Sequence, residues 1–265
     1  MATLELGDGS PSVRKLQKAL KDAGFDPGLV DGEFGAGTEA ALKAFQQSAG
    51  LLADGVAGPR TLKALGLVKS DKLEPALDRF STQVVAQMFV GAPLANIRNY
   101  LPVVLEAMKA AGMVDRTMLL MALCTIRAET AGFAPINEGV SRYNTSPRGH
   151  QFDLYDNRKD LGNRGEPDGA SYKGRGFIQL TGRSNYQTYG KRLGVPLEKE
   201  PDRANEPMVA AQILACFLAD RERQIKEAVL EGDLRHARRL VNGGSHGLDV
   251  FVQAWRIGDM LTDDE

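Results

Sequence analysis

The sequence Asp31-Gly32-Glu33-Phe34-Gly35-Ala36-Gly37-Thr38 returns as Asp54-Gly55-Val56-Ala57-Gly58-Pro59-Arg60-Thr61, so the pattern D-G-x-x-G-x-x-T occurs twice at an offset of 23 residues. Asp-Gly is a turn signal, because glycine adopts positive φ without steric cost. The closing threonine can cap or open the helix that follows each loop. An internal repeat of this kind indicates one structural step used twice.

Three short helices are predicted around the two loops. The first has an apolar stripe at positions i, i+3 and i+7, the second covers residues 38–48, and the third follows the second loop. Gly24 and Gly50 stand where helix stops are expected. Residues 1–67 therefore form a small helical unit that is stable without disulfides or metal ligands. The apolar positions of the first and third helices are Val13, Leu16, Leu20, Leu62 and Leu65.

The rest of the chain is predicted to hold a linker and a larger, mainly α-helical domain. A charged stretch ends in Pro75, which disfavours helix just before it, so we place a linker at 68–79 and a second domain at 80–265. Residues 130–176 are loop-rich, and a long loop inside a compact domain is usually functional or mobile. Strand-like character is confined to 177–180. Helices are expected at 80–89, 97–111, 116–129, 187–193, 207–219 and 234–241.

Composition and charge exclude several classes of protein. The 265 residues carry 33 basic and 34 acidic side chains, a net charge of −1, which removes the electrostatic argument for a nucleic-acid partner or an anionic membrane. Three histidines and two cysteines are too few for the usual zinc site, and we expect Cys124 and Cys216 to be buried apolar side chains. The longest apolar run, 118–126, is too short to span a bilayer. The N-terminus lacks the basic and apolar regions of an export signal.

Glu129 is the first candidate for chemistry. It ends the apolar helix predicted at 116–129 and precedes a turn that contains glycine. A carboxyl group there is partly desolvated and lies at the negative end of the helix dipole, and both effects favour the protonated form. Such a group is suited to act as a general acid. From position alone, the alternative is a surface charge beyond the helix end.

A second carboxyl group is needed for glycoside hydrolysis, which uses one protonated donor and one ionised base or nucleophile. Glu138 follows Glu129 by nine residues, and a turn with a short loop can place the two groups across a cleft. On the residues alone, five other acids could serve instead or be solvated loop charges: Asp153, Asp156, Asp160, Glu166 and Asp168.

Two later segments have the composition of a sugar-binding site. In 173–186, glycines that allow a close backbone approach precede amide and hydroxyl side chains, which suit neutral polyhydroxyl or acetamido ligands. The segment 241–244, Val-Asn-Gly-Gly, is equally consistent with a turn that ends a helix. The polar side chains of the first segment are Gln179, Thr181, Asn185 and Tyr186.

Residues 1–67 resemble the peptidoglycan-binding domain found beside many cell-wall enzymes. The resemblance rests on the pattern V-x-x-L-Q-x-x-L that contains Gln17, on the two D-G-x-x-G-x-x-T loops, and on Ala44-Phe45-Gln46. It implies a three-helix module that anchors the protein to the wall.

The chain from about residue 80 onward resembles glycoside hydrolase family 19, in the lysozyme-like superfamily. The more specific likeness is to its short phage and bacterial members used as endolysins. The resemblance implies a mainly α-helical, two-lobed, lysozyme-like catalytic domain. Three blocks carry it: A-E-T-A-G-F at 128–133, G-R-G-F-I-Q-L-T at 174–181 with Asn185-Tyr186, and Asp233-Leu234 with V-N-G-G at 241–244.

This second resemblance also implies roles for individual residues. Glu129 is then the general acid, Glu138 the general base, and Thr181 orients the attacking water. The family implies an inverting mechanism, with the two carboxyl groups about 6.5–9.5 Å apart and without a metal or an organic cofactor. The residues that would contact the sugar are Gln179, Asn185, Tyr186, Asn242 and Tyr143.

The favoured function is a modular endolysin that hydrolyses the β-1,4 glycosidic bonds of peptidoglycan, with the small domain raising the local concentration of the catalytic one. The runner-up is a chitinase, against which the low aromatic content of 6% argues. A wall-binding structural protein would not need Glu129. An amidase or peptidase needs a zinc-ligand cluster or a Cys–His pair, which is not indicated by His150, His236, His246 and Cys124.

The expected partner is the peptidoglycan polymer, with no nucleic acid and no stable membrane association, and the protein is expected to be a monomer. Because an export signal is not recognisable, the enzyme is expected to stay in the host cytoplasm until a holin-type protein permeabilises the membrane. It would then reach the periplasm and the cell wall.

Overall fold

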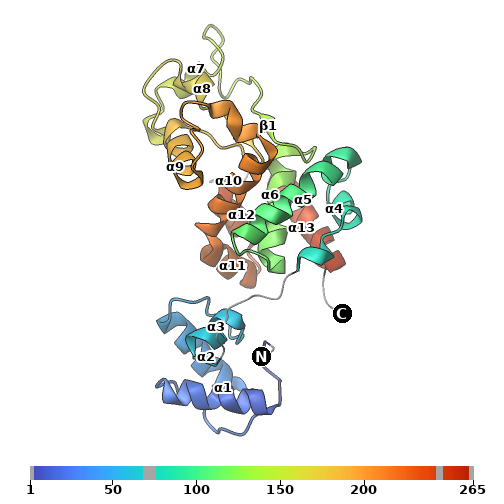
Figure 1. Ribbon diagram of the computed structural model, residues 1–265, viewed down its shortest axis with the longest axis vertical. Helices are drawn as coiled ribbons and strands as arrows, with labels where there is room; N and C mark the ends of the chain where they lie inside the picture. Colours follow the sequence, from blue (N-terminus) through green and yellow to red (C-terminus); the bar gives the residue numbers. More distant parts are fainter. Residues whose placement is uncertain (1–2, 68–75, 243–246, 263–265) are drawn as a thin grey trace. The chain divides into compact units, whose positions relative to one another are not determined.

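The chain forms two compact units in a computed structural model that describes residues 3–67, 76–242 and 247–262 (Figure 1). One unit groups residues 1–75 with 223–237, and the other groups 76–222 with 238–265. The expected domains run continuously instead, so their boundaries stay a prediction. Most of the expected linker and the pair Gly243-Gly244 lie outside the described residues.

The three helices expected in the first unit are confirmed as α1 (Pro11–Asp22), α2 (Ala36–Ser48) and α3 (Pro59–Ala64). Ser10 caps α1 by accepting a hydrogen bond from the main-chain nitrogen of Val13. Gly24 and Gly50 follow α1 and α2 at φ +89° and +68°, as helix-ending glycines do. The core of this unit consists of Leu4, Val13, Leu16, Leu20, Phe34, Ala41, Leu42, Phe45, Ala57 and Leu62.

A buried glutamine closes each of the two repeated loops. Gln17 of α1 donates from Nε2 to Asp31 Oδ1 at 2.9 Å and to Thr38 Oγ1 at 3.1 Å. Its Oε1 accepts the main-chain N–H of Gly32 at 2.8 Å. One amide side chain therefore satisfies the turn, the aspartate and the threonine of its loop at once.

The second loop repeats these contacts with Gln46 of α2. Its Nε2 donates to Asp54 Oδ1 at 2.7 Å and to Thr61 Oγ1 at 3.2 Å, and its Oε1 accepts from Gly55 at 3.0 Å. The two threonines therefore do not cap the helices, as the sequence suggested they could. Glycines stand at the N-cap positions, and each threonine lies inside its helix and accepts a bond from the glutamine.

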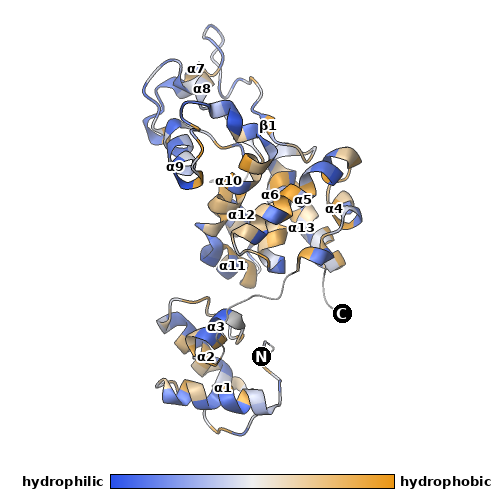
Figure 2. Cartoon of the chain, in the orientation of Figure 1, coloured by the Kyte–Doolittle hydropathy of each residue, from blue (hydrophilic) through white to orange (hydrophobic). Residues whose placement is uncertain are grey.

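The second unit is built around α6 (Arg116–Thr130), which is buried without interruption from Met118 to Ile126. Helices α4, α10 and α13 pack against it, and the helices of this region carry much of the hydrophobic colouring in Figure 2. The helices that follow the linker are η1 (Leu77–Arg79), α4 (Thr82–Met88), α5 (Leu94–Ala110), α7 (Asp153–Asp156), η2 (Lys159–Leu161), α8 (Asp168–Ser171), α9 (Arg183–Leu193), η3 (Pro201–Asn205), α10 (Pro207–Ala219), α11 (Glu222–Leu230), α12 (Leu234–Asn242) and α13 (Leu248–Thr262). All of α11 except Glu222, and the part of α12 up to Ala237, are grouped with the first unit.

The two longest helices that were not expected from the sequence are α11 and α13; the short segments η1, α7, η2, α8 and η3 were not expected either. In α13 the buried residues Phe251, Ala254, Trp255 and Gly258 follow the spacing i, i+3, i+4, i+7, so the signal was present. Gly258 weakens the helical pattern but is needed there, because a Cβ at this position would lie 2.6 Å from Leu120 of α6. The close approach of α13 to α6 explains a glycine inside a helix.

The two cysteines differ in their surroundings. Cys124 of α6 is buried as expected, and burial raises the pKa of its thiol well above the ordinary value. Cys216 of α10 is only partly buried, which corrects the expectation for this residue. Within the described ranges, every helix falls short of the length and hydropathy needed to cross a bilayer.

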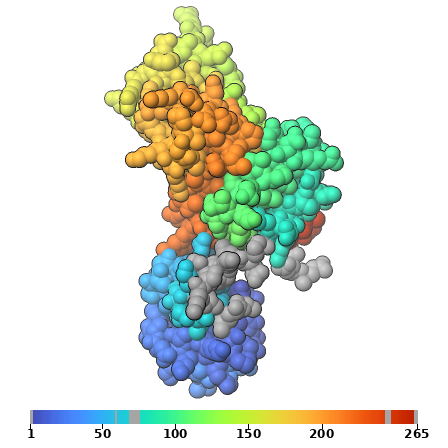
Figure 3. Space-filling view, in the orientation of Figure 1, coloured from blue at the N-terminus to red at the C-terminus, as the bar shows by residue number. Residues whose placement is uncertain are grey.

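A two-stranded antiparallel ribbon joins the helical core to the loop-rich region. Strand β1 (Ile136–Asn137) pairs with β2 (Arg175–Gly176). The strand expected at 177–180 is wrong: these residues form a turn, in which Arg175 and Leu180 exchange two main-chain hydrogen bonds. In the space-filling view, the loop-bearing part in yellow and orange and the green helices form two lobes of this unit (Figure 3).

Candidate active site

Glu129 lies in the last turn of α6, where it meets a cation from α12. Arg238 donates from Nη2 to Glu129 Oε1 at 2.7 Å. The arginine is fully buried, with its guanidinium 5.9 Å from the ring centre of Phe251. The surroundings of this carboxyl group therefore include a positive charge that the sequence analysis did not anticipate, and that charge fixes the position of one carboxyl oxygen.

The turn after Glu129 is held in an uncommon backbone conformation. Ala131 and Phe133 have φ values of 35° and 53°, which non-glycine residues rarely adopt. Asn96 donates to the main-chain oxygen of Gly132 at 2.8 Å, and Arg127 donates to that of Ala131 at 2.8 Å. These contacts fix the direction in which the chain leaves α6 and enters β1, directly before Glu138.

Glu138 is half-buried and accepts three hydrogen bonds. Asn144 Nδ2 and the Tyr155 hydroxyl donate to Oε1 at 2.9 and 2.8 Å, and the main-chain nitrogen of Gly174 donates to Oε2 at 3.0 Å. The main-chain nitrogen of Glu138 also donates to the oxygen of Gly174 at 2.8 Å. These donors fix the positions of both oxygens of the Glu138 carboxyl group.

Gly174 brings two predicted site residues to the same place. A Cβ at this position would lie 2.9 Å from Gln179 Oε1 and 3.1 Å from Glu138 Oε2, so only glycine fits between them without a shift. Gln179 donates from Nε2 to the main-chain oxygens of Ile136 and Gly176 at 3.0 and 3.1 Å. Its amide nitrogen therefore secures the ribbon that presents Glu138.

Thr181 and Asn185 continue from this ribbon. The Thr181 hydroxyl donates to the main-chain oxygen of Gln179 at 2.9 Å, and Asn185 Nδ2 donates to that of Thr181 at 2.8 Å. Both side chains are partly exposed. Because the hydroxyl hydrogen of Thr181 is donated to the main chain, the hydroxyl oxygen can take part in further hydrogen bonds only as an acceptor.

Tyr186 lies in the core, which corrects its expected place among the sugar contacts. Its hydroxyl donates to the main-chain oxygen of Lys173 at 2.8 Å and accepts from Arg175 Nη1 at 3.0 Å. Burial raises the pKa of Tyr186 to about 12. Arg175, the arginine of the G-R-G segment, is itself buried and pairs with Asp202 at 2.8 Å. Tyr186 and Arg175 therefore hold this segment in place from the protein interior.

The other two expected sugar contacts lie on separate elements. Tyr143 is exposed on the loop just before Asn144, with the Arg142 guanidinium 4.9 Å from its ring centre. Asn242 ends α12, one turn beyond Arg238 and on the same helix face, and is partly exposed.

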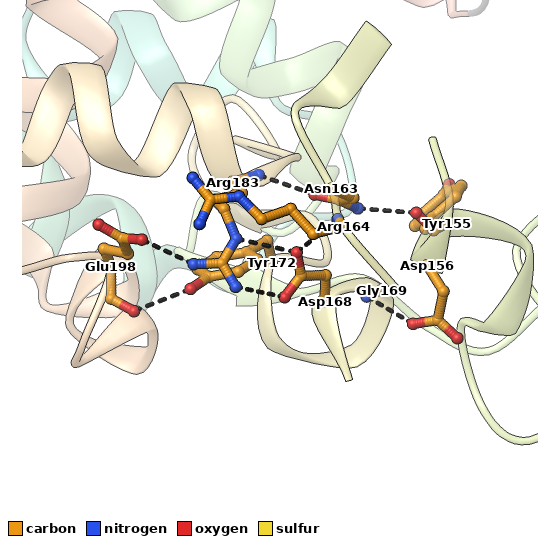
Figure 4. A network of polar contacts seen from close by, with 9 residues as sticks. All are labelled: Tyr155, Asp156, Asn163, Arg164, Asp168, Gly169, Tyr172, Arg183 and Glu198. Carbon is orange, nitrogen blue, oxygen red and sulfur yellow. Dashed lines mark hydrogen bonds and ion pairs between the residues drawn. The ribbon is translucent and has the colours of Figure 1, made fainter. Parts of the chain in front are cut away.

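Four of the five alternative acids of the loop region are engaged in hydrogen bonds or ion pairs within it. Asp168 receives two hydrogen bonds from Arg183, at 2.8 and 2.5 Å, which lower the pKa of Asp168 (Figure 4). Asp156 is buried, and its Oδ1 accepts the main-chain N–H of Gly169 at 2.9 Å. The remaining three are Asp153, which accepts from Ser146, Asp160, which pairs with Arg158, and Glu166, which is exposed.

Sequence reasoning missed three residues that contact the two glutamates: Asn144, Tyr155 and Arg238. Arg238 did leave a signal, because it occupies i+4 of an apolar stripe whose other members are Leu234, Ala237 and Val241. A cation on the apolar side of a helix indicates a buried partner. Asn144 and Tyr155 left none, because a loop and a helix of four residues are too irregular or too short to show a periodicity.

Comparisons with known proteins address each unit separately. Residues 9–65 match the family model described as "Putative peptidoglycan binding domain". The N-acetylmuramoyl-L-alanine amidase CwlM of Mycobacterium tuberculosis is 50% identical over 58 residues, which cover 22% of this chain but only 14% of that protein. The chain thus spans a small part of this relative, whose activity says nothing about the second unit.

A larger part of the chain matches a glycosyl hydrolase family 19 domain-containing protein of Haemophilus influenzae. The two are 26% identical over 179 residues, which cover 58% of this chain and 84% of that protein. Among solved structures, chitinase C from Streptomyces griseus has a TM-score of 0.46 at 15% identity and covers 74% of this chain and 82% of its own.

The mainly helical fold and the likeness to the Haemophilus influenzae protein support a glycoside hydrolase. More particularly, the chain joins an N-terminal peptidoglycan-binding domain to a domain similar to glycoside hydrolase family 19, the layout of a modular cell-wall hydrolase.

Proposed function

We propose that the chain is an endolysin that hydrolyses the β-1,4 glycosidic bonds of peptidoglycan by inverting general acid–base catalysis. The observation that carries the proposal is a pair of glutamates on adjoining elements, each with its carboxyl group held in place. The buried Arg238 binds Glu129 at 2.7 Å, and three neutral donors bind Glu138. Glycoside hydrolysis requires two such positioned carboxyl groups.

Glu129 supplies the proton in this mechanism. The proton passes to the glycosidic oxygen as the bond between that oxygen and the anomeric carbon breaks. Arg238, which contacts Oε1 at 2.7 Å, then stabilises the carboxylate that remains.

Glu138 accepts a proton from the attacking water, whose oxygen forms the new bond to the anomeric carbon from the opposite face. The Thr181 oxygen accepts the other hydrogen of this water and so orients it. Because no covalent intermediate forms, the product has the inverted configuration, and this mechanism calls for a separation of about 6.5–9.5 Å between the two carboxyl groups. The step requires neither a metal nor an organic cofactor.

The substrate is held by neutral polar groups and by the first unit. Gln179, Asn185, Asn242 and the exposed Tyr143 are proposed to contact the amino sugars, and Tyr186 supports them from the core. The peptidoglycan-binding domain keeps the catalytic unit close to the polymer, which raises its effective concentration there.

Digestion of purified sacculi tests the reaction type. A glycosidase releases new reducing ends without new free amino groups, whereas an amidase or peptidase releases free amino groups. We expect only reducing ends, and NMR of the first product should show the inverted anomer. Glu129→Gln should lose at least about 100-fold in rate, and its melting temperature should fall as well, because the change removes the charge that pairs with the buried Arg238. Faster turnover on chitin oligomers than on sacculi would favour the chitinase instead.

The proposed biological role is lysis of a bacterial host from within. The enzyme would act as a monomer that waits in the cytoplasm until a holin-type protein opens the membrane. Expression in a Gram-negative host tests this order of events: cells should stay intact until a membrane-permeabilising agent is added and then lyse rapidly. Lysis without the agent, or no lysis with it, contradicts the proposed timing.

A further inference from the structure

Tyr155 binds the proposed base directly. Its hydroxyl oxygen lies 2.8 Å from Glu138 Oε1, the oxygen that also accepts from Asn144. Tyr155 comes from the short helix α7, seventeen residues further along the chain. The contact therefore depends on how the loop region between β1 and β2 is folded.

The main chain at Tyr155 is tied to a network of polar contacts (Figure 4). Asn163 donates from Nδ2 to the main-chain oxygen of Tyr155 at 2.8 Å, and its Oδ1 accepts the main-chain N–H of Arg183 at 2.9 Å. Asn163 is buried, and Arg183 is held by its ion pairs with Asp168 and Glu198 at 2.5 and 2.6 Å. A chain of contacts thus runs from these ion pairs to the tyrosine.

The ring of Tyr155 is also restrained by packing. Its centre lies 6.5 Å from that of Phe152, a buried residue at φ 67°. The ammonium group of Lys173, two residues before β2, lies 5.1 Å from the centre of the Phe152 ring. Both the main chain and the ring of Tyr155 are therefore held before any substrate arrives.

The hydroxyl of Tyr155 stays a hydrogen-bond donor over the whole working pH range. Burial, and then the bond to Glu138, raise the pKa of Tyr155 to about 12. Arg158 acts in the opposite direction, but it is paired with Asp160 at 2.7 Å. The phenol can therefore donate to the carboxylate and does not compete with it for a proton.

We propose that Tyr155 is a positioning residue for catalysis, whose hydroxyl keeps the Glu138 carboxylate oriented and ionised, and that the network around Asn163 and Arg183 fixes that hydroxyl. The proposal rests on the proposed function, in which Glu138 is the base. In this proposal the ion pairs of Arg183 with Asp168 and Glu198 contribute to catalysis as well as to the stability of the loop region.

The test is the pH dependence of glycan hydrolysis by Tyr155→Phe. Without the donor the charged carboxylate is less favoured, so the acidic limb of the kcat/KM profile should move to higher pH by about half a unit to one unit. At neutral pH, kcat should fall about tenfold, while KM should change less than about twofold, because the proposed role of Tyr155 is to hold Glu138 and not the sugar.

Tyr189→Phe is the matched control. It removes a hydroxyl that donates to Asp220 at 3.3 Å in the same unit, far along the chain from Glu138. Its kcat and pH profile should overlay those of the unmodified chain. An unshifted acidic limb and unchanged kcat in Tyr155→Phe would overturn the positioning role.

A fluorinated tyrosine at position 155 keeps the shape of the side chain and so avoids a folding defect. Its more acidic phenol is a stronger donor, and the acidic limb should move to lower pH, opposite to the Phe variant. A shift in the same direction as Phe contradicts the proposal. Glu138→Gln is measured in parallel: if it keeps its activity, the base assignment itself fails, whereas its inactivity beside an unshifted Tyr155→Phe overturns the positioning role alone.

Discussion

The two units of the chain use a similar device for different ends: one side chain at the centre of a glycine-containing loop binds several parts of that loop. In the first unit the central group is a neutral amide, Gln17 or Gln46, which both donates and accepts. In the second unit it is the Glu138 carboxylate, which only accepts, from Asn144, Tyr155 and Gly174. An amide is enough to keep a loop closed, whereas a carboxylate can also take up a proton.

The largest effect on activity is expected for Glu138→Gln, which replaces the carboxylate at the centre of the second unit's loop by an amide like those of the first unit. The amide is close in shape to the carboxylate but cannot act as a base, so the rate should fall about 100- to 10,000-fold. The melting temperature should change little. Hydrolysis of sacculi and thermal unfolding measure the two quantities. Glu166→Gln is the control, because Glu166 is an exposed acid of the same loop region, and retained activity in Glu138→Gln would show that another carboxylate is the base.

The reverse exchange, Gln46→Glu, should destabilise the first unit. A carboxylate cannot donate to Asp54 Oδ1 or Thr61 Oγ1, and it places a charge beside the Asp54 carboxylate in a buried position. The cost is about 3 kcal/mol. Gln47→Glu, one position along and exposed, is the matched control. Hydrogen exchange at the Gly55 amide, which donates to Gln46, reports the effect locally; equal protection in both variants contradicts the role of Gln46.

A smaller effect is expected from Arg183→Met. This change leaves Asp168 buried without its ion pair, at a cost of about 2 kcal/mol, since the arginine is partly exposed. It also loosens the contacts that lead to Tyr155, so kcat should fall severalfold. Arg192→Met is the control, because Arg192 pairs with Asp220 at the surface. A loss of stability with unchanged kcat would separate the network from catalysis.

The smallest effect concerns the first unit in acid. The hydrogen bond from Gln17 is the main cause that lowers the pKa of Asp31. A carboxyl group with a lowered pKa stabilises the fold above its unfolded pKa of about 3.9, and this contribution is lost as the pH falls through the folded value. Protection of the Gly32 amide should therefore decrease below about pH 4. In Gln17→Met this pH dependence should be weaker, and an identical dependence would show that another group is responsible.

The sequence predicts most helices and the order of the candidate residues, because apolar periodicity and local motifs are read within one element. Helix α10 has the predicted bounds, and α6 differs by one residue at its end. The contact between Arg238 and Glu129 joins positions 109 residues apart, and no local pattern specifies such a pairing. Only the packing of α12 against the end of α6 brings the two together.

Tyr186 shows a different reason for failure. Amide and hydroxyl groups suit a sugar, but they suit the main chain equally well, and the sequence does not say which partner is nearer. The hydroxyl of Tyr186 binds the main chain at Lys173, and the Gln179 amide nitrogen binds that at Ile136. Polar composition therefore identified the segment that builds the site, but not the direction of each side chain.

The paired glutamines of the first unit also have a consequence for protein engineering. The two loops have the same length from aspartate to threonine, but the segments between each glutamine and its aspartate differ in length. Gln17 and Asp31 are 14 positions apart, and Gln46 and Asp54 are eight positions apart. The segment between glutamine and aspartate thus differs by six residues between the two loops, and the glutamine side chain binds the loop aspartate in both. This connecting segment is where a tag or a recognition peptide can be inserted, whereas an insertion between the aspartate and the threonine would break the closure.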